Sequence, residues 1–424
     1  MGVAPDRRAR RLRRFLLGAI TAGGVVVALE LILQSASWFI PTVAVLLSHE
    51  GQVPVEYRVG DEVLGYRPSP AHVDHDRRGF RNRTAVQHAR IVALGDSQTY
   101  GTGVEPDEAW PQQLGASTGA VTYNMAFGGY GPTHSLVLLD EALSLSPEVV
   151  IEGFYAGNDL WDSYHMVHEL RQLPELRSDD PELMRQIDEA NRLDPLKARV
   201  ETLTRIYGQG TVSEPQDNST GRRVLGAGRT LLSEHSKVYG VVRAVRRELA
   251  AQKERGKAES WAPLMEKAGS SAGQWEAFES AAGFRTIFVP QYRDAVLDWG
   301  DVRIREGHRL ALAAIERMHE RVRSFGAKFL VVLIPTKELV FEDMVAGAAR
   351  SKHFSALLEH EKQMWEQTKT TLTAAGIEFV DALPVLKARL IRGEQPYPQS
   401  QDGHPNAAGQ GAIAQLVADW LAHR

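Results

Sequence analysis

The chain has 424 residues, of which 43% are hydrophobic and 24% charged, with no cysteine and a formal net charge of −4. This composition is typical of a folded globular protein, and the absence of cysteine excludes disulfides, thiolate metal sites and cysteine nucleophiles. The charge is uneven, because residues 1–37 contain six arginines and only two acidic residues. The remaining chain is therefore mildly acidic, which argues against a nucleic-acid partner.

The N-terminal region has the pattern of a membrane anchor. Residues 1–14 form a basic tail, and residues 15–37 form an apolar stretch in which Glu30 is the one charged residue. A helix of about 20 such residues spans the roughly 30 Å of a bilayer core. We therefore predict a cytoplasmic tail, a single-pass transmembrane helix over 15–37 and a main body on the periplasmic side of the cell membrane. A cleaved signal peptide ending near Ser35-Ala36-Ser37 is the alternative.

The main body alternates between predicted strands and helices. Residues 50–90 are polar and turn-rich, and we expect an irregular lead-in there. Apolar runs predict five strands, at 91–94, 121–127, 148–155, 328–334 and 377–380, and helical patterns separate most of them. This alternation predicts an α/β fold with a doubly wound, five-stranded, mainly parallel sheet. The alternation stops between about 162 and 300, where we expect a helical insertion that forms a cap or a partner surface.

Polar residues follow the predicted strands. Ser97 follows the first strand, Gly129 the second and Asn158 the third, while Asp402 and His404 lie in a loop before the last helix. Because the carboxyl ends of parallel strands meet at one edge of a sheet, these residues are expected to lie close together. Acyl transfer needs a nucleophile, a general base, a group that orients the base and donors for an oxyanion. Taken singly, the same segments are also typical of helix caps and turns.

Four of these segments, in this order, resemble the sequence blocks of the SGNH (GDSL-type) hydrolase superfamily. Gly95-Asp96-Ser97 matches the nucleophile block, residues 124–129 the second block and Gly157-Asn158-Asp159 the third. Asp402-Gly403-His404 matches the final block in a shorter Asp-x-His form. The resemblance covers about residues 91–160 and 328–421 of a domain that we place at 91–424. It implies the flavodoxin-like fold of that superfamily.

The resemblance also implies residue roles. Ser97 would be the nucleophile, His404 the general base and Asp402 the residue that orients the imidazole. The oxyanion hole would consist of the Ser97 N–H, the Gly129 N–H and the Asn158 side-chain amide. Gly129 is chosen over its glycine neighbours by the spacing of the family block alone.

These roles imply a membrane-anchored serine esterase that hydrolyses an extracytoplasmic O-acyl ester of a small molecule or saccharide, without a cofactor. Two alternatives stay open: an O-acyltransferase acting on cell-envelope polysaccharide, and a non-catalytic envelope scaffold with the same fold. The other histidines lack the spacing of metal ligands, so no metal is proposed.

Two further groups of residues have two interpretations each. The segment Thr336-Lys337-Glu338 either lines the cleft or is structural. Tyr130, Tyr155 and Trp161 either stack on a sugar or pack in the core, and the core is favoured.

Overall fold

The computed structural model describes residues 57–209, 261–345 and 350–423, together with residues 21, 24, 25 and 28–30. The chain divides into two units, Met1–Glu56 with Glu214–Ala258 and Tyr57–Ser213 with Glu259–Arg424. All elements discussed below belong to the second unit. Of the anchor predicted over 15–37, only residues 21, 24, 25 and 28–30 are described, and the rest lies outside the described residues. Within the described ranges, no helix combines the length and apolar character needed to cross a membrane.

A five-stranded sheet forms the centre of the second unit. Its order is β4 (Thr122–Asn124), β3 (Ile91–Gly95), β5 (Val149–Tyr155), β8 (Lys328–Ile334) and β9 (Phe379–Asp381), and every neighbouring pair is parallel. In chain order this is 2-1-3-4-5, the flavodoxin-like arrangement, so the predicted parallel sheet is confirmed. The strand order reverses between β3 and β5. Ligands bind at such a switch point, and Ser97 and Asn158 follow these two strands.

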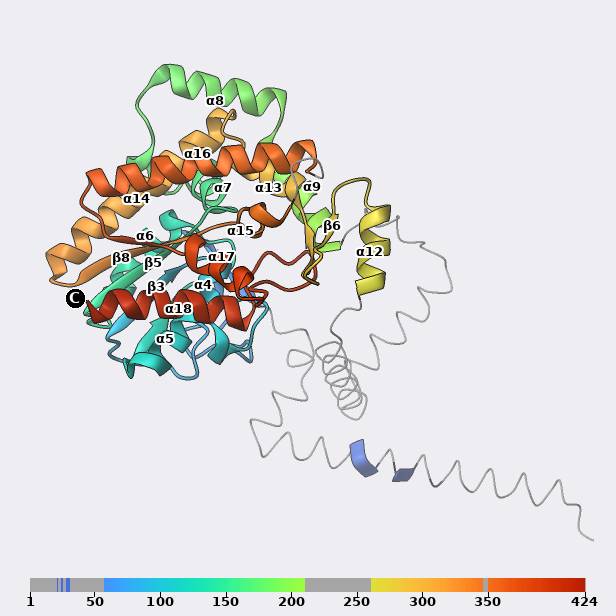
Figure 1. Ribbon diagram of the computed structural model, residues 1–424. Helices are drawn as coiled ribbons and strands as arrows, with labels where there is room; N and C mark the ends of the chain where they lie inside the picture. Colours follow the sequence, from blue (N-terminus) through green and yellow to red (C-terminus); the bar gives the residue numbers. More distant parts are fainter. Residues whose placement is uncertain are drawn as a thin grey trace, which may run out of the picture. The chain divides into compact units, whose positions relative to one another are not determined.

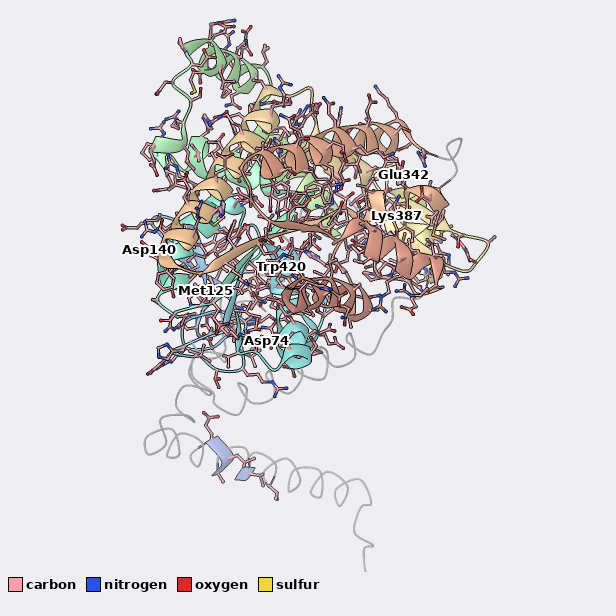
Figure 2. All side chains as sticks on the ribbon, turned by 60° about the vertical axis from the view of Figure 1, so that its left-hand side comes forward. Asp74, Met125, Asp140, Glu342, Lys387 and Trp420 are labelled. Carbon is pink, nitrogen blue, oxygen red and sulfur yellow. The ribbon has the colours of Figure 1, made fainter. Side chains whose placement is uncertain are left out.

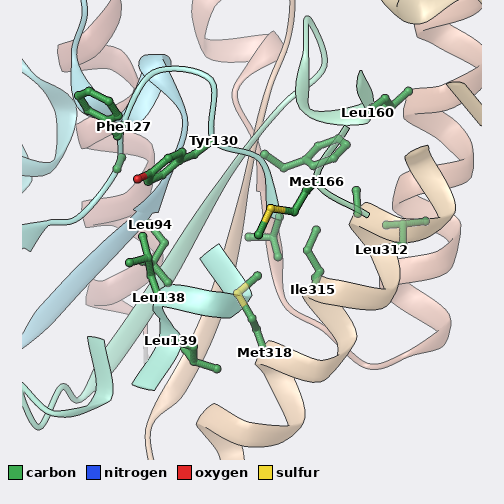
Figure 3. Close-up of a cluster of buried hydrophobic side chains, with 14 of the residues drawn as sticks. Leu94, Phe127, Tyr130, Leu138, Leu139, Leu160, Met166, Leu312, Ile315 and Met318 are labelled. Carbon is green, nitrogen blue, oxygen red and sulfur yellow. The ribbon is translucent and has the colours of Figure 1, made fainter. Parts of the chain in front are cut away.

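Helices cover both faces of the sheet because its strands are apolar on both sides. On β3, Val92 and Leu94 belong to a core cluster with residues of α6 (Pro132–Leu143), α7 (Asp159–Tyr164) and α14 (Val302–Phe325). Figure 3 shows part of this cluster around Leu94, Leu138 and Ile315. Ile91 and Ala93 face the opposite side, against α5 (Trp110–Thr118), α17 (Leu383–Ile391) and α18 (Ala407–Ala422). Figure 1 shows α14 and α18 on opposite sides of the sheet.

Local sequence signals set the ends of the long helices. Asp301 caps α14 by accepting a hydrogen bond from the Arg303 N–H, and Gly326 closes this helix with a left-handed backbone. Ser351 caps α16 (Lys352–Ala374) in the same way, and α16 contributes to both core clusters.

The segment after β8 is joined to α17 at the surface. It contains α15 (Lys337–Val340) and a 3₁₀ turn over Glu342–Met344. Lys387 of α17 places its Nζ 3.7 Å from Glu342 Oε2 and 2.7 Å from Asp343 Oδ2, and Figure 2 labels Glu342 and Lys387. Such exposed pairs contribute at most about 1 kcal/mol, so they support this packing rather than determine it.

The lead-in and the insertion contain more strand than expected. Within the lead-in, β1 (Arg58–Asp61) and β2 (Gly65–Pro68) form an antiparallel hairpin. The insertion contains α8 (Pro181–Leu193), α9 (Leu196–Gln209), α12 (Trp261–Ser270) and α13 (Pro290–Leu297). It also contains a second hairpin, β6 (Glu276–Glu279) with β7 (Arg285–Phe288), which the prediction of a helical insertion did not include. Residues 210–260 of the insertion lie outside the described residues.

Candidate active site

Ser97 lies at the sharp junction between β3 and the short helix α4 (Ser97–Tyr100). Gly95 ends the strand with φ +138°, and a Cβ there would lie 2.8 Å from the Gly153 carbonyl oxygen, so glycine is required. The buried Asp96 is the N-cap of α4 and accepts a hydrogen bond from the Gln98 N–H at 2.8 Å. The Gly-Asp-Ser segment is therefore a helix cap, and this cap places a serine at the carboxyl edge of the sheet.

His404 joins Ser97 to Asp402. Ser97 Oγ lies 2.8 Å from His404 Nε2, and His404 Nδ1 lies 2.5 Å from Asp402 Oδ1. The same Asp402 oxygen accepts a hydrogen bond from the His404 backbone N–H at 3.0 Å. Because an ionised carboxylate only accepts, Nδ1 carries the ring proton and Nε2 is free to accept the serine proton. The structure thus brings together the three residues that the sequence placed at one sheet edge.

Lys337 holds the loop that carries Asp402. Its fully buried ammonium donates to the carbonyl oxygens of Asp402 at 3.0 Å, Ser400 at 3.0 Å and Ile287 at 2.7 Å. Burial lowers the pKa of Lys337 to about 8. Burial alone would raise the pKa of Asp402, but His404 and Lys337 outweigh it and leave that pKa below its ordinary value. Asp402 is therefore ionised at neutral pH.

The Thr336-Lys337-Glu338 segment is structural rather than part of the cleft lining. Thr336 Oγ1 donates to Glu361 at 2.5 Å, and its side chain also caps α15. Glu338 accepts a hydrogen bond from the Val289 N–H at 3.1 Å. All three side chains are buried, and none of them lines the pocket around Ser97.

The three predicted oxyanion donors come from three different segments around one pocket. Ser97, as the first residue of α4, has a backbone N–H without an intrahelical acceptor. Gly129 belongs to the turn after β4, and its N–H makes no hydrogen bond within the described part of the chain. Asn158 is the N-cap residue of α7, and its side-chain amide donates to Asp162. One amide hydrogen of Asn158 therefore stays available.

Ser97, His404, Gly129 and Asn158 all line one pocket of about 240 Å³. A larger cavity of about 640 Å³ adjoins it, because the two share five lining residues: Gly129, Trp161, Asp162, Val200 and Thr204. The wall between them thus includes α9 of the insertion. Tyr155 and Trp161 line the catalytic pocket although they are largely buried, whereas Tyr130 is a core residue.

Sequence reasoning missed Arg293, a buried residue of α13 that lines the catalytic pocket. Its Nη1 donates to the Gly157 carbonyl oxygen at 3.0 Å, next to Asn158. The rings of Tyr155, Tyr207 and Tyr292 lie 5.0–5.6 Å from the guanidinium carbon, and no acidic side chain in the described ranges pairs with it. A single arginine in a helix of the insertion matches no motif, so its place in the pocket emerges only from the tertiary packing.

Buried acids surround the catalytic pocket. Burial raises the pKa of Asp96 to about 6, an effect that the Gln98 N–H and His404 partly offset. Burial also raises the pKa of Glu152, in the central strand β5, to about 8. The pKa values of Asp159 and Asp162 are likewise raised well above the ordinary range, first by burial and then by Asp96. These raised pKa values favour the uncharged form of the carboxyl groups, which limits the negative charge near the pocket.

Comparison with known families adds to this geometry. Residues 301–424 match the family model described as "SGNH hydrolase-like domain, acetyltransferase AlgX". This match supports the SGNH superfamily. The matched segment contains Asp402 and His404, whereas Ser97 lies outside it. The five-stranded parallel sheet with helices on both faces fits the SGNH α/β fold. The match to a model of this superfamily supports the interpretation that the protein is an enzyme that acts on esters.

Solved structures resemble the chain only at low sequence identity and low TM-score. Phospholipase A1 from Streptomyces albidoflavus is 12% identical with a TM-score of 0.36, over 78% of this chain and 99% of that one. An extracellular lipase from Streptomyces rimosus is 13% identical with a TM-score of 0.37, over 78% of this chain and 98% of that one. Because these scores are low, the fold is assigned from the sheet topology. No protein with curated annotation matches the chain.

Proposed function

We propose that this protein is a serine esterase of the SGNH type that hydrolyses a carboxylic O-acyl ester. The observation that carries the proposal is the continuous hydrogen-bonded chain from Ser97 Oγ through His404 to Asp402, with bond lengths of 2.8 and 2.5 Å. This arrangement is the one that activates a serine hydroxyl for attack on an acyl carbon.

The reaction follows from the positions of these atoms. Ser97 Oγ attacks the ester carbonyl carbon while its proton passes to His404 Nε2, and the carbonyl oxygen becomes an oxyanion facing Gly129 and Asn158. The acyl C–O bond then breaks, and His404 returns the proton to the departing alcohol. Water then attacks the acyl-serine while His404 takes a proton from it. The acyl C–Oγ bond breaks and His404 returns the proton to Ser97 Oγ, which releases the acid and restores Ser97. Asp402 holds the imidazole and stabilises its charged form.

Acyl transfer is the second candidate, and two observations favour it. The matching family model is described by an acetyltransferase, and a cavity of about 640 Å³ adjoins the pocket of the nucleophile. In this reaction the hydroxyl of an acceptor, such as a saccharide, replaces water in the second step. The same residues serve both reactions, and the outcome depends on whether water or the acceptor reaches the acyl-serine first.

The cellular setting is also a proposal. We propose that residues 15–37 tether the protein to the cell membrane with the catalytic domain on the periplasmic side, from the arginine-rich tail and the apolar stretch after it. Protease treatment of intact spheroplasts tests this. Degradation of the domain supports the proposal, and full protection contradicts it.

The enzymatic proposal is tested by labelling the purified protein with a fluorophosphonate, with Ser97→Ala as the control. We expect labelling and turnover of short p-nitrophenyl esters for the natural sequence only. Equal labelling of both proteins, or no labelling of either, would reject both candidate reactions and favour a non-catalytic scaffold. If labelling depends on Ser97, the ratio of acylated acceptor to free acid in the presence of saccharide acceptors separates transfer from hydrolysis.

A further inference from the structure

The turn that carries Gly129 can adopt two orientations of its central peptide. The Tyr130 N–H donates to the Phe127 carbonyl oxygen at 3.1 Å, which closes a four-residue turn over 127–130. Gly129 has φ +78°, whereas Gly128 is not in the positive-φ region, and this is the signature of a type II turn. Types I and II differ mainly by a flip of the peptide between the two central residues. With glycine at both positions, neither orientation meets a Cβ, so the flip is sterically inexpensive.

This flip decides where the Gly129 N–H points. The N–H belongs to the same planar peptide as the Gly128 carbonyl, and in a trans peptide the two groups point in opposite directions. Whatever holds the Gly128 oxygen therefore also sets the direction of the Gly129 N–H. A flipped peptide would replace the N–H donor by a carbonyl oxygen, which repels an oxyanion.

Tyr66 of the lead-in hairpin holds that oxygen. Its hydroxyl donates to the Gly128 carbonyl oxygen at 3.0 Å. Burial raises the pKa of Tyr66 well above its usual range, so the hydroxyl keeps its proton and stays a donor. A Cβ on Gly129 would lie 2.2 Å from the Tyr66 hydroxyl oxygen, so this close approach also depends on the glycine.

The ring of Tyr66 is itself fixed in place. It lies 5.8 Å from the Tyr130 ring and 5.9 Å from the Phe127 ring, and the guanidinium of Arg58 lies 4.7 Å above it. The Tyr130 hydroxyl donates to the Tyr66 backbone oxygen at 2.7 Å. At the other end of the turn, the Phe127 N–H donates to the Gly95 carbonyl oxygen at 3.1 Å, two residues before Ser97. The turn is thus anchored to the strand of the nucleophile and to Tyr66.

We propose that Tyr66 is a positioning residue that holds the Gly128–Gly129 peptide in the orientation needed for the oxyanion hole. The inference rests on the proposed function, and it gives the lead-in segment a part in the reaction. The Tyr66 hydroxyl acts through this peptide and takes no proton from the reacting atoms. A hydrogen bond received by the carbonyl also polarises the peptide and strengthens its N–H as a donor.

The test compares Tyr66→Phe with Tyr123→Phe. Tyr66→Phe removes the hydroxyl and keeps the ring that packs on Phe127 and Tyr130. Tyr123→Phe is the matched control, because its hydroxyl also joins the lead-in to the sheet, at 2.7 Å from Asp76 Oδ2, but does not contact the turn. Both variants are made in the full chain, and the melting temperature, kcat, KM and the rate of fluorophosphonate labelling are measured for each.

For Tyr66→Phe we expect kcat and the labelling rate to fall about five- to tenfold, as the loss of a hydrogen bond worth about 1 kcal/mol predicts, with KM unchanged. Tyr123→Phe should lose stability but keep kcat. An unchanged kcat in Tyr66→Phe would overturn the proposal. So would a raised KM at constant kcat, or equal losses of kcat in the two variants. If the natural sequence itself fails to label, the proposed function fails first, and this proposal fails with it.

Discussion

Replacing Asn158 by alanine tests the proposed oxyanion hole, because it removes one of the three donors assigned to it. The Asn158 amide gives one hydrogen to Asp162, which leaves a single N–H for the oxyanion. Loss of one such donor costs about 3 kcal/mol in the transition state, or about 10²- to 10³-fold in kcat. We expect the lower end, about 10²-fold, because the Ser97 and Gly129 N–H groups remain. KM should change little, since the uncharged carbonyl of the substrate binds these donors weakly.

The assay is steady-state hydrolysis of p-nitrophenyl acetate, with the melting temperature measured in parallel. Asn191→Ala is the matched control, because the Asn191 amide donates to the Tyr164 hydroxyl at 2.9 Å, and Asn191 lies outside the lining of the catalytic pocket. The control should lose some stability and keep kcat. If kcat of Asn158→Ala stays within about threefold of the natural value, the assignment of this amide to the oxyanion hole is refuted.

Two further predictions concern the carboxyl groups. Asp402→Asn should lower kcat by about 10³- to 10⁴-fold with little loss of stability, because an amide can present an N–H to His404 Nδ1 and favour the wrong imidazole tautomer. A loss of kcat below about tenfold in ester hydrolysis would contradict this role of Asp402. Glu152 binds its proton more tightly in the folded than in the unfolded chain, because its pKa rises from 4.5 to about 8 on folding. The free energy of unfolding should therefore fall as the pH rises from about 4.5 to about 8. Glu152→Gln removes the contribution of Glu152 to this pH dependence. In urea titrations between pH 5 and pH 8, the variant should gain stability relative to the natural sequence by up to about 1.4 kcal/mol per pH unit. A difference in free energy of unfolding between the two proteins that does not vary with pH would contradict a buried, protonated Glu152.

The sheet was predictable because its strands carry strong local signals. Runs such as Val149–Ile151 and Leu330–Ile334 are buried on both faces, and a strand of this kind reads as continuous apolar sequence. The polar residues after these strands had to meet at the carboxyl edge once the strands were parallel. Strand ends were less predictable, because the apolar run over 121–127 extends beyond β4, which is limited to Thr122–Asn124.

The walls of the site were not predictable. Arg293 and Tyr207 reach the pocket from helices of the insertion that carry no motif, and only tertiary packing places them beside Gly157 and Gly403. The β6–β7 hairpin was missed because its four-residue strands are too short for a reliable alternating pattern. The contact between Tyr66 and Gly128 spans 62 residues and follows no motif. The sequence motifs identified Ser97, Asp402 and His404, but not the supporting residues Tyr66, Tyr207 and Arg293.

The central claim is that His404 activates Ser97 for attack on an ester. The most direct measurement is the rate of fluorophosphonate labelling of the intact protein, its Ser97→Ala variant and its His404→Gln variant, with the modified residue located by mass spectrometry. We predict a single adduct on Ser97, none in Ser97→Ala, and labelling at least about 10³-fold slower in His404→Gln. Labelling of Ser97 at an unchanged rate without His404, or an adduct on a different residue, would contradict the account.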